Sequence, residues 1–162
     1  MPESFYKNPN VPDADQIYRT NLIIWAAMLA AQFMFLMLAF LSKPEVFNFG
    51  QTSATVGLIV PSSINPVIII LAVIGITTFI VSFVLKSRLI KLAIDNKQIA
   101  QVQTGQIIAC ALCEFTTLLG LVVALKFAFP VSLIWFALGI LGIFLHFPRR
   151  TNFIAAAFTG IA

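Results

Sequence analysis

The stretch IIACALCEFTTLLGLVVAL, Ile107–Leu125, is an apolar run with one carboxylate, Glu114, close to its middle. At a rise of about 1.5 Å per residue, a helix of this length crosses most of a hydrocarbon core about 30 Å thick. An ionised carboxylate near the centre of such a span costs about 3 kcal/mol on insertion scales. The run therefore predicts a membrane span in which Glu114 is protonated or held by polar neighbours.

The composition places the whole chain in the same class. Of 162 residues, 60% are hydrophobic and only 10% are charged, whereas about a quarter of the residues of a soluble domain carry charge. The start of the chain lacks a basic segment followed by a cleavable apolar core, so we expect no signal peptide. We predict an all-α integral membrane protein, a single domain forming a four-transmembrane-helix bundle, with spans at about 22–41, 66–85, 107–125 and 131–147.

Basic residues between these runs predict the orientation, because Lys and Arg accumulate on the cytoplasmic side of a membrane protein. Eight of the ten fall on one side if both termini and the middle connection are cytoplasmic. We therefore expect N-in and C-in topology in an inner membrane of bacterial type. The remaining parts are predicted as an outer interfacial segment (42–65), a cytoplasmic loop (86–106) and an interfacial tail (148–162).

Polar side chains near mid-membrane are the candidates for function. Gln32 lies near the middle of the first span, and Thr117 follows Glu114 within the third. We expect Glu114 to face the bundle and to form a hydrogen bond with a polar group of the bundle, as a clasp between helices. Gln32 is the leading candidate for its partner, and the other candidates are Thr77, Thr78, Thr116 and Thr117. The functional alternative is an ion-binding site made by Glu114, Gln32 and Thr117, since protonatable groups inside membranes often mark ion pathways.

Small residues recur at three- or four-residue intervals along the third span and predict a helix-packing seam. The members of this seam are Gly105, Ala109, Cys113, Gly120 and Ala124.

Other chemistry in the sequence is sparse. Cys110 and Cys113 have a C-x-x-C spacing but no further ligands nearby, so we predict no metal site. His146, the only histidine, is interpreted as an interfacial residue, with a haem or pigment ligand as the alternative. We expect basic residues at the cytoplasmic ends of the spans to contact lipid headgroups, namely Lys86, Arg88, Arg149 and Arg150.

The segment AIDNKQIAQVQTGQIIACALCEFTTLLGLVVAL, residues 93–125, resembles the loop and second helix of the proteolipid (c) subunits of rotary ATPases. In that family the glutamate is the ion carrier, and the matching position here is Glu114. The match covers about a fifth of the chain. Pro66–Leu85 contains only Gly75 where the family's first helix repeats glycines to form a ring.

Two functions follow as hypotheses. The first is a non-catalytic accessory or scaffold subunit of a larger respiratory or photosynthetic membrane complex, because no catalytic motif occurs. Its expected partners are membrane lipids and other integral membrane subunits, with no nucleic acid and no soluble substrate; it would have no cofactor of its own, although a bound lipid, quinone or pigment fits its aromatic content. The alternative is a proton- or sodium-translocating protein similar to a c subunit, which uses Glu114.

Overall fold

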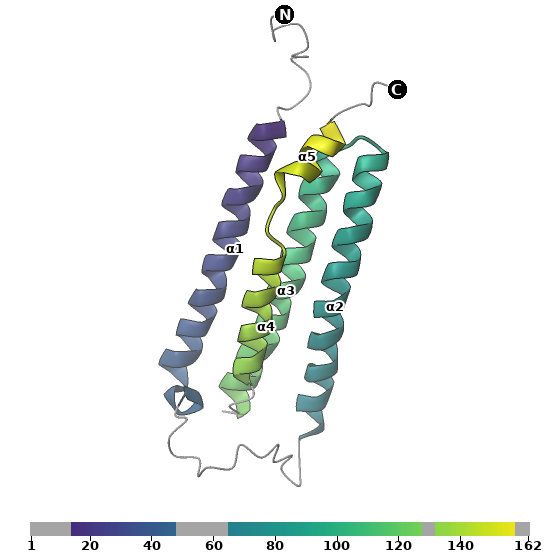
Figure 1. Ribbon diagram of the computed structural model, residues 1–162. Coiled ribbons are helices and arrows are strands. Elements are labelled where there is room, and N and C mark those ends of the chain that lie inside the picture. Colours follow the sequence, from purple (N-terminus) through teal and green to yellow (C-terminus); the bar gives the residue numbers. More distant parts are fainter. Residues whose placement is uncertain (1–13, 48–64, 128–131, 158–162) are drawn as a thin grey trace, which may run out of the picture.

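A computed structural model describes residues 14–47, 65–127 and 132–157 of the chain. Within these ranges the protein is helical and contains no strand. The elements are α1 (Ala14–Ser42), η2 (Pro44–Phe47), α2 (Pro66–Asp95), α3 (Ile99–Phe127), α4 (Ser132–Leu145) and α5 (Arg150–Ala157). The α-helices are labelled in Figure 1.

Three of these helices, α1, α2 and α3, are long and apolar enough to cross a membrane. Helix α4 has only 14 residues, which corresponds to about 21 Å and falls short of a full crossing. It reaches the required length and composition only when it is taken together with α5, from which it is bent by 46°. For the described residues the prediction of an all-α protein is confirmed, and the helices include three or four candidate membrane spans.

The helices extend well beyond the predicted spans at one end, so the predicted loop at 86–106 is wrong. Helix α2 continues to Asp95 and α3 begins at Ile99. The last part of α2, KSRLIKLAID at residues 86–95, keeps apolar residues at helical spacing among good helix formers. Hydropathy marks where lipid ends, and that need not be where a helix ends.

The turn between α2 and α3 is therefore short. The N–H of Gln98 donates to the carbonyl of Ala93 at 2.9 Å, and that of Lys97 donates to Ile94 at 3.2 Å. Lys97 has a φ of 54°, the left-handed conformation that commonly ends a helix. This turn lets two long helices pack directly against each other.

Two other predicted segments are partly described. The expected interfacial tail contains the helix α5, and the expected outer segment begins with the short helix η2. Residues 48–64 and 158–162 lie outside the described residues, so the rest of these predictions is not addressed.

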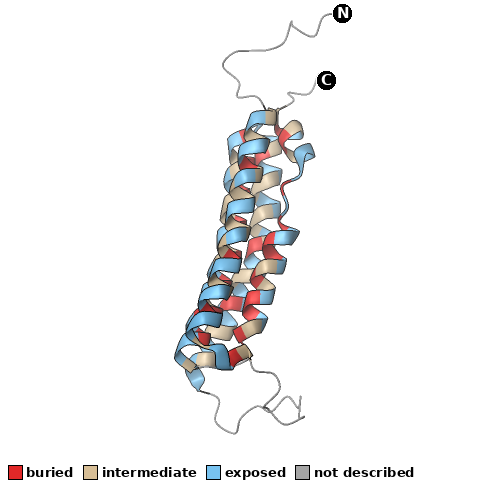
Figure 2. Cartoon of the chain, turned by 90° about the vertical axis from the view of Figure 1, so that its left-hand side faces the viewer, coloured by how far each residue is buried: buried red, intermediate tan, exposed pale blue. Residues whose placement is uncertain are grey.

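Helix α3 occupies the middle of the molecule and packs against α1, α2 and α4. Half of its most apolar stretch is buried, whereas 11% of the corresponding stretches of α1 and α2 is buried. Figure 2 shows the outward side of α1 as largely exposed, with buried residues where the helices face one another. The core is thus a set of contacts centred on α3.

At the end of the molecule where α1 begins, α5 folds back across the helices. The ring of Tyr18 meets that of Phe153 edge-on at 5.8 Å, and Arg150 pairs with Asp15 through Nη2 and Oδ1 at 2.8 Å. Phe153 also joins a small apolar cluster with Ala93 and Val102. These contacts bring α5 together with the starts of α1 and α3 and the end of α2.

Candidate functional site

Gln32 of α1 and Thr117 of α3 meet in the core, where both are fully buried. The Thr117 hydroxyl donates a hydrogen bond to Oε1 of Gln32. The predicted bond between Gln32 and Glu114 is therefore wrong: the amide pairs with the threonine one turn further along. Each residue turns an α-helix by about 100°, so Glu114 is rotated away from the inward direction marked by its neighbour Cys113.

Glu114 itself lies at the margin of the buried face of α3. Its side chain is half-buried, and the described part of the chain gives its carboxylate no hydrogen bond. Of the three residues proposed for an ion site, the structure joins two, Gln32 and Thr117. The acid stands beside them on the same helix as Thr117.

A second polar cluster surrounds His146, which is 1% exposed. Its Nε2 lies 3.0 Å from Oγ of Ser82 on α2, and its backbone carbonyl accepts a hydrogen bond from the Gln106 amide of α3. The ring of Phe83 lies 4.4 Å from the imidazole. His146 is thus packed between helices, and ligation of haem or pigment through Nε2 would first break its contact with Ser82.

The two cysteines are free and buried. Cys113 donates a weak hydrogen bond to Ser82 at 3.6 Å, and the Gln106 amide lies 3.6 Å from the Cys110 sulfur. Within the described ranges, no three His, Cys, Asp or Glu side chains are grouped closely enough to hold a metal ion.

All five residues of the predicted small-residue seam on α3 are buried. A Cβ at Gly105 would come within 2.9 Å of Leu89 Cβ on α2, and one at Gly120 would collide with Trp135 of α4. From the other side, Gly139 and Gly142 of α4 rest on Thr117 and Cys113. The seam thus lies at close approaches of α3 to both α2 and α4.

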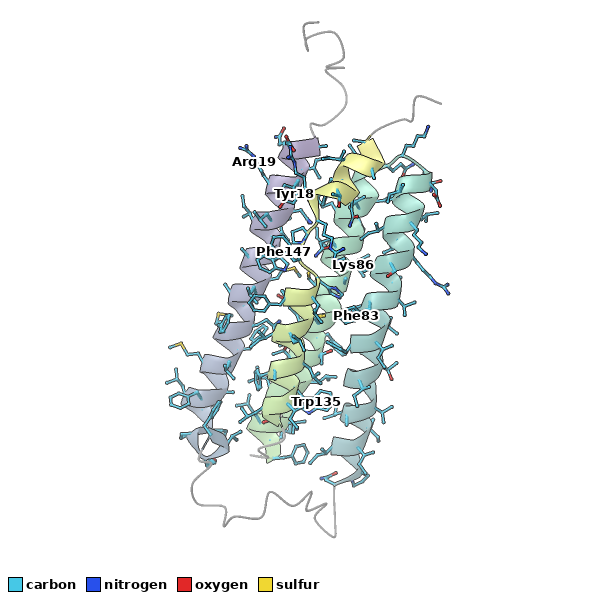
Figure 3. The ribbon with its side chains drawn as sticks, in the orientation of Figure 1. Tyr18, Arg19, Phe83, Lys86, Trp135 and Phe147 are labelled. Carbon is cyan, nitrogen blue, oxygen red and sulfur yellow. The ribbon has the colours of Figure 1, made fainter. Side chains whose placement is uncertain are left out.

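Basic residues line an open groove of about 330 Å³ between α2, the end of α4 and the start of α5. Of the four predicted headgroup contacts, Lys86 and Arg149 line it. Arg150 instead forms the ion pair with Asp15, and Arg88 is not part of the lining. In Figure 3, Phe83 and Lys86 lie on the side of α2 that faces α4.

Two further polar residues, Lys91 and Asn152, also line this groove. Lys91 is one of the four basic residues between the second and third predicted spans, all of which were expected to attract anionic headgroups, whereas the sequence reasoning missed Asn152. The α2 residues of the groove recur at intervals of three and one, which is the spacing of a single helix face: they are Phe83, Lys86, Ser87, Ile90 and Lys91. Asn152 could not be found in this way, because it enters the groove only through the fold-back of α5.

Comparison with protein-family models, with curated proteins and with solved structures finds no match to this chain.

Proposed function

We propose that this protein is a non-catalytic accessory subunit of a larger energy-transducing membrane complex of the respiratory or photosynthetic kind. It would contribute a rigid four-helix bundle and contacts with lipid, quinone or pigment. The observation that supports this role is a set of side-chain hydrogen bonds between elements. In the described core, these bonds connect one helix to the next.

These connections join several pairs of elements. Thr117 joins α3 to α1, and Thr116 joins α3 to α2 through the Gly75 carbonyl at 3.4 Å. Ser82 links α2 to the end of α4 through His146. The indole N–H of Trp25 on α1 donates to the Ile143 carbonyl of α4 at 2.8 Å. Side-chain hydrogen bonds inside membranes average only about 0.6 kcal/mol each, so their value lies in fixing how the helices are oriented.

The outward faces of α1 and α2 support a partner role. Along the outward face of α2, large apolar side chains are exposed, among them Ile70, Val73, Ile76 and Ile80. In a membrane such faces contact either acyl chains or the helices of other subunits. Two helices whose apolar stretches are mostly unburied offer ample surface for both.

We place both termini and the α2–α3 turn in the cytoplasm of a bacterial-type inner membrane. Support comes from the distribution of basic residues over the described structure. The end that holds the start of α1, the α2–α3 turn and α5 contains Arg19, Lys86, Arg88, Lys91, Lys97, Arg149 and Arg150, and the other end contains Lys43 and Lys126. The positive-inside rule assigns the first end to the cytoplasm.

The test of the accessory role is native mass spectrometry of the tagged full chain, expressed at its natural level and purified in mild detergent. We expect one copy of the chain among unlike integral membrane subunits, at fixed stoichiometry, with loss of the complex's turnover or yield when the gene is deleted. A closed ring of identical copies, or a free monomer, would overturn the proposal.

Ion translocation by Glu114 remains the second candidate, and one observation favours it. Glu114 is the only acidic residue within the four predicted spans, and it lies on the second helix of a tightly turned helical pair, α2–α3, like the ion carrier in the proteolipid subunits that residues 93–125 resemble. Glu114→Gln separates the two roles. The scaffold role predicts normal assembly and turnover, whereas translocation predicts normal assembly with loss of ion coupling.

A further inference from the structure

We propose that the basic groove binds the phosphate of an anionic phospholipid. Three cations, Lys86, Lys91 and Arg149, line this one groove. The described chain contains two ion pairs, Lys43–Glu45 and Arg150–Asp15, and neither involves these three cations. No acidic residue is among those that line the groove.

Like charges gathered in one place repel one another, and this repulsion is relieved by a bound anion. The groove also supplies neutral hydrogen-bonding groups, the hydroxyl of Ser87 and the side-chain amide of Asn152. Charged and neutral donors around a space of about 330 Å³ suit the oxygens of a phosphate, which accept several hydrogen bonds at once.

The remaining lining indicates that the phosphate belongs to a lipid. Phe83, Ile90 and Leu145 contribute apolar surface to the same groove. Lys86 directly follows the predicted span 66–85, so the groove lies at the depth of the headgroups, with hydrocarbon on one side. A soluble phosphate would gain nothing from apolar side chains, whereas a phospholipid can lay the start of an acyl chain along them.

Arg150 shows why this groove differs from a general positive surface. Although it lies next to Arg149 in the sequence, its guanidinium makes a two-pronged contact with Asp15, at 2.9 Å from Nε to Oδ1 and 2.9 Å from Nη2 to Oδ2. That pair leaves Arg149 as the cation of this segment that lines the groove. The basic sequence HFPRR is thus divided between a structural contact and a binding role.

The experiment uses the purified full chain in detergent, with bound lipid measured by native mass spectrometry. Phosphatidylglycerol, phosphatidylcholine and inorganic phosphate are titrated separately. We expect phosphatidylglycerol to bind more tightly than phosphatidylcholine. Because a basic residue near a membrane surface contributes about 1 kcal/mol, Lys86→Gln and Arg149→Gln should each weaken phosphatidylglycerol binding about fivefold.

Matched variants make the result specific. Arg88→Gln removes the same charge from α2 outside the groove and should leave the preference for phosphatidylglycerol unchanged, while Lys86→Arg should preserve it. Lys91→Gln alters an exposed residue, so it tests the groove even if Lys86→Gln does not fold.

Three results would overturn the proposal. The first is equal binding of the two lipids by the parent protein. In the second, Arg88→Gln weakens binding as much as Lys86→Gln does, which would mean a diffuse charge effect. The third is occupation of the site by inorganic phosphate that blocks phosphatidylglycerol, which would assign the groove to a soluble anion. None of these results depends on whether the protein is an accessory subunit.

Discussion

Gly139 illustrates how closely α4 approaches the polar centre of the molecule. A Cβ at this position would collide with Oγ1 of Thr117 and would come within 3.1 Å of Oε1 of Gln32. Overpacking usually costs about 1–3 kcal/mol, and an overlap with a buried oxygen belongs in the upper part of that range, about 2–3 kcal/mol. The better helix propensity of alanine offsets about 1 kcal/mol of this cost. We therefore expect Gly139→Ala to lower the free energy of unfolding by about 1–2 kcal/mol, measured by denaturant titration in detergent.

The control for this substitution is Ala137→Leu, which adds volume on an exposed position of α4 and should change stability little. Adding Thr117→Ala to Gly139→Ala should recover part of the loss, because it removes the atom that the new methyl group meets. If Gly139→Ala were as stable as the parent protein, α4 could not lie against Thr117 as described.

At the scale of single residues, the sequence indicated which polar residues to examine but not which hydrogen-bond partners they have. It marked Gln32, Glu114 and Thr117 as the polar groups to follow, but the pairing it predicted was wrong. The difference between Glu114 and Thr117 is one of rotation around α3, and a single sequence does not say which helices flank which side. Hydrogen bonds from side chains to backbone carbonyls, such as that from Trp25 to Ile143, cannot be predicted from the acceptor's residue type, because every residue has a carbonyl.

Among the elements, the α2–α3 turn contains a residue in an unfavourable backbone conformation. Lys97 has a φ of 54°, which costs a residue with a Cβ about 1–2 kcal/mol. Glycine avoids this cost, although it also makes the unfolded chain more flexible by about 0.4–1 kcal/mol. We expect Lys97→Gly to raise the free energy of unfolding by about 0.5–1 kcal/mol in the same denaturant titration.

Lys97→Ala separates this backbone effect from the loss of charge, because it removes the ammonium group and keeps the Cβ. It should give no gain in stability. An equal gain from both variants would attribute the effect to relief of repulsion among the basic residues of this end.

Element positions were predictable wherever lipid dictates them. Each of the first three predicted spans lies inside a helix, since apolar length is required to cross the hydrocarbon core. The helix ends were not predictable in the same way. Beyond Leu85 the chain leaves the apolar run but keeps helical spacing, so α2 continues to Asp95, and the polar composition of residues 86–106 was mistaken for a loop.

For the molecule as a whole, the distribution of charge between its two ends makes the topology testable with single cysteines. Cys110 and Cys113 are at most 1% exposed, so a membrane-impermeant maleimide should leave the unaltered protein unlabelled. Ser42, at the end of α1, and Gln98, in the α2–α3 turn, are exposed at opposite ends of the helices. Neither substitution to cysteine changes a charge, so the bias that sets orientation is preserved.

With both termini in the cytoplasm, Ser42→Cys should be labelled on intact bacterial spheroplasts, and Gln98→Cys only after the membrane is permeabilised. The unaltered chain serves as the background control in both conditions. The reverse pattern would place the seven basic residues of the α5 end outside the cell, against the positive-inside rule. Labelling of both positions on intact spheroplasts would mean that α1 does not separate the two ends by a membrane, and the span assignment itself would then be wrong.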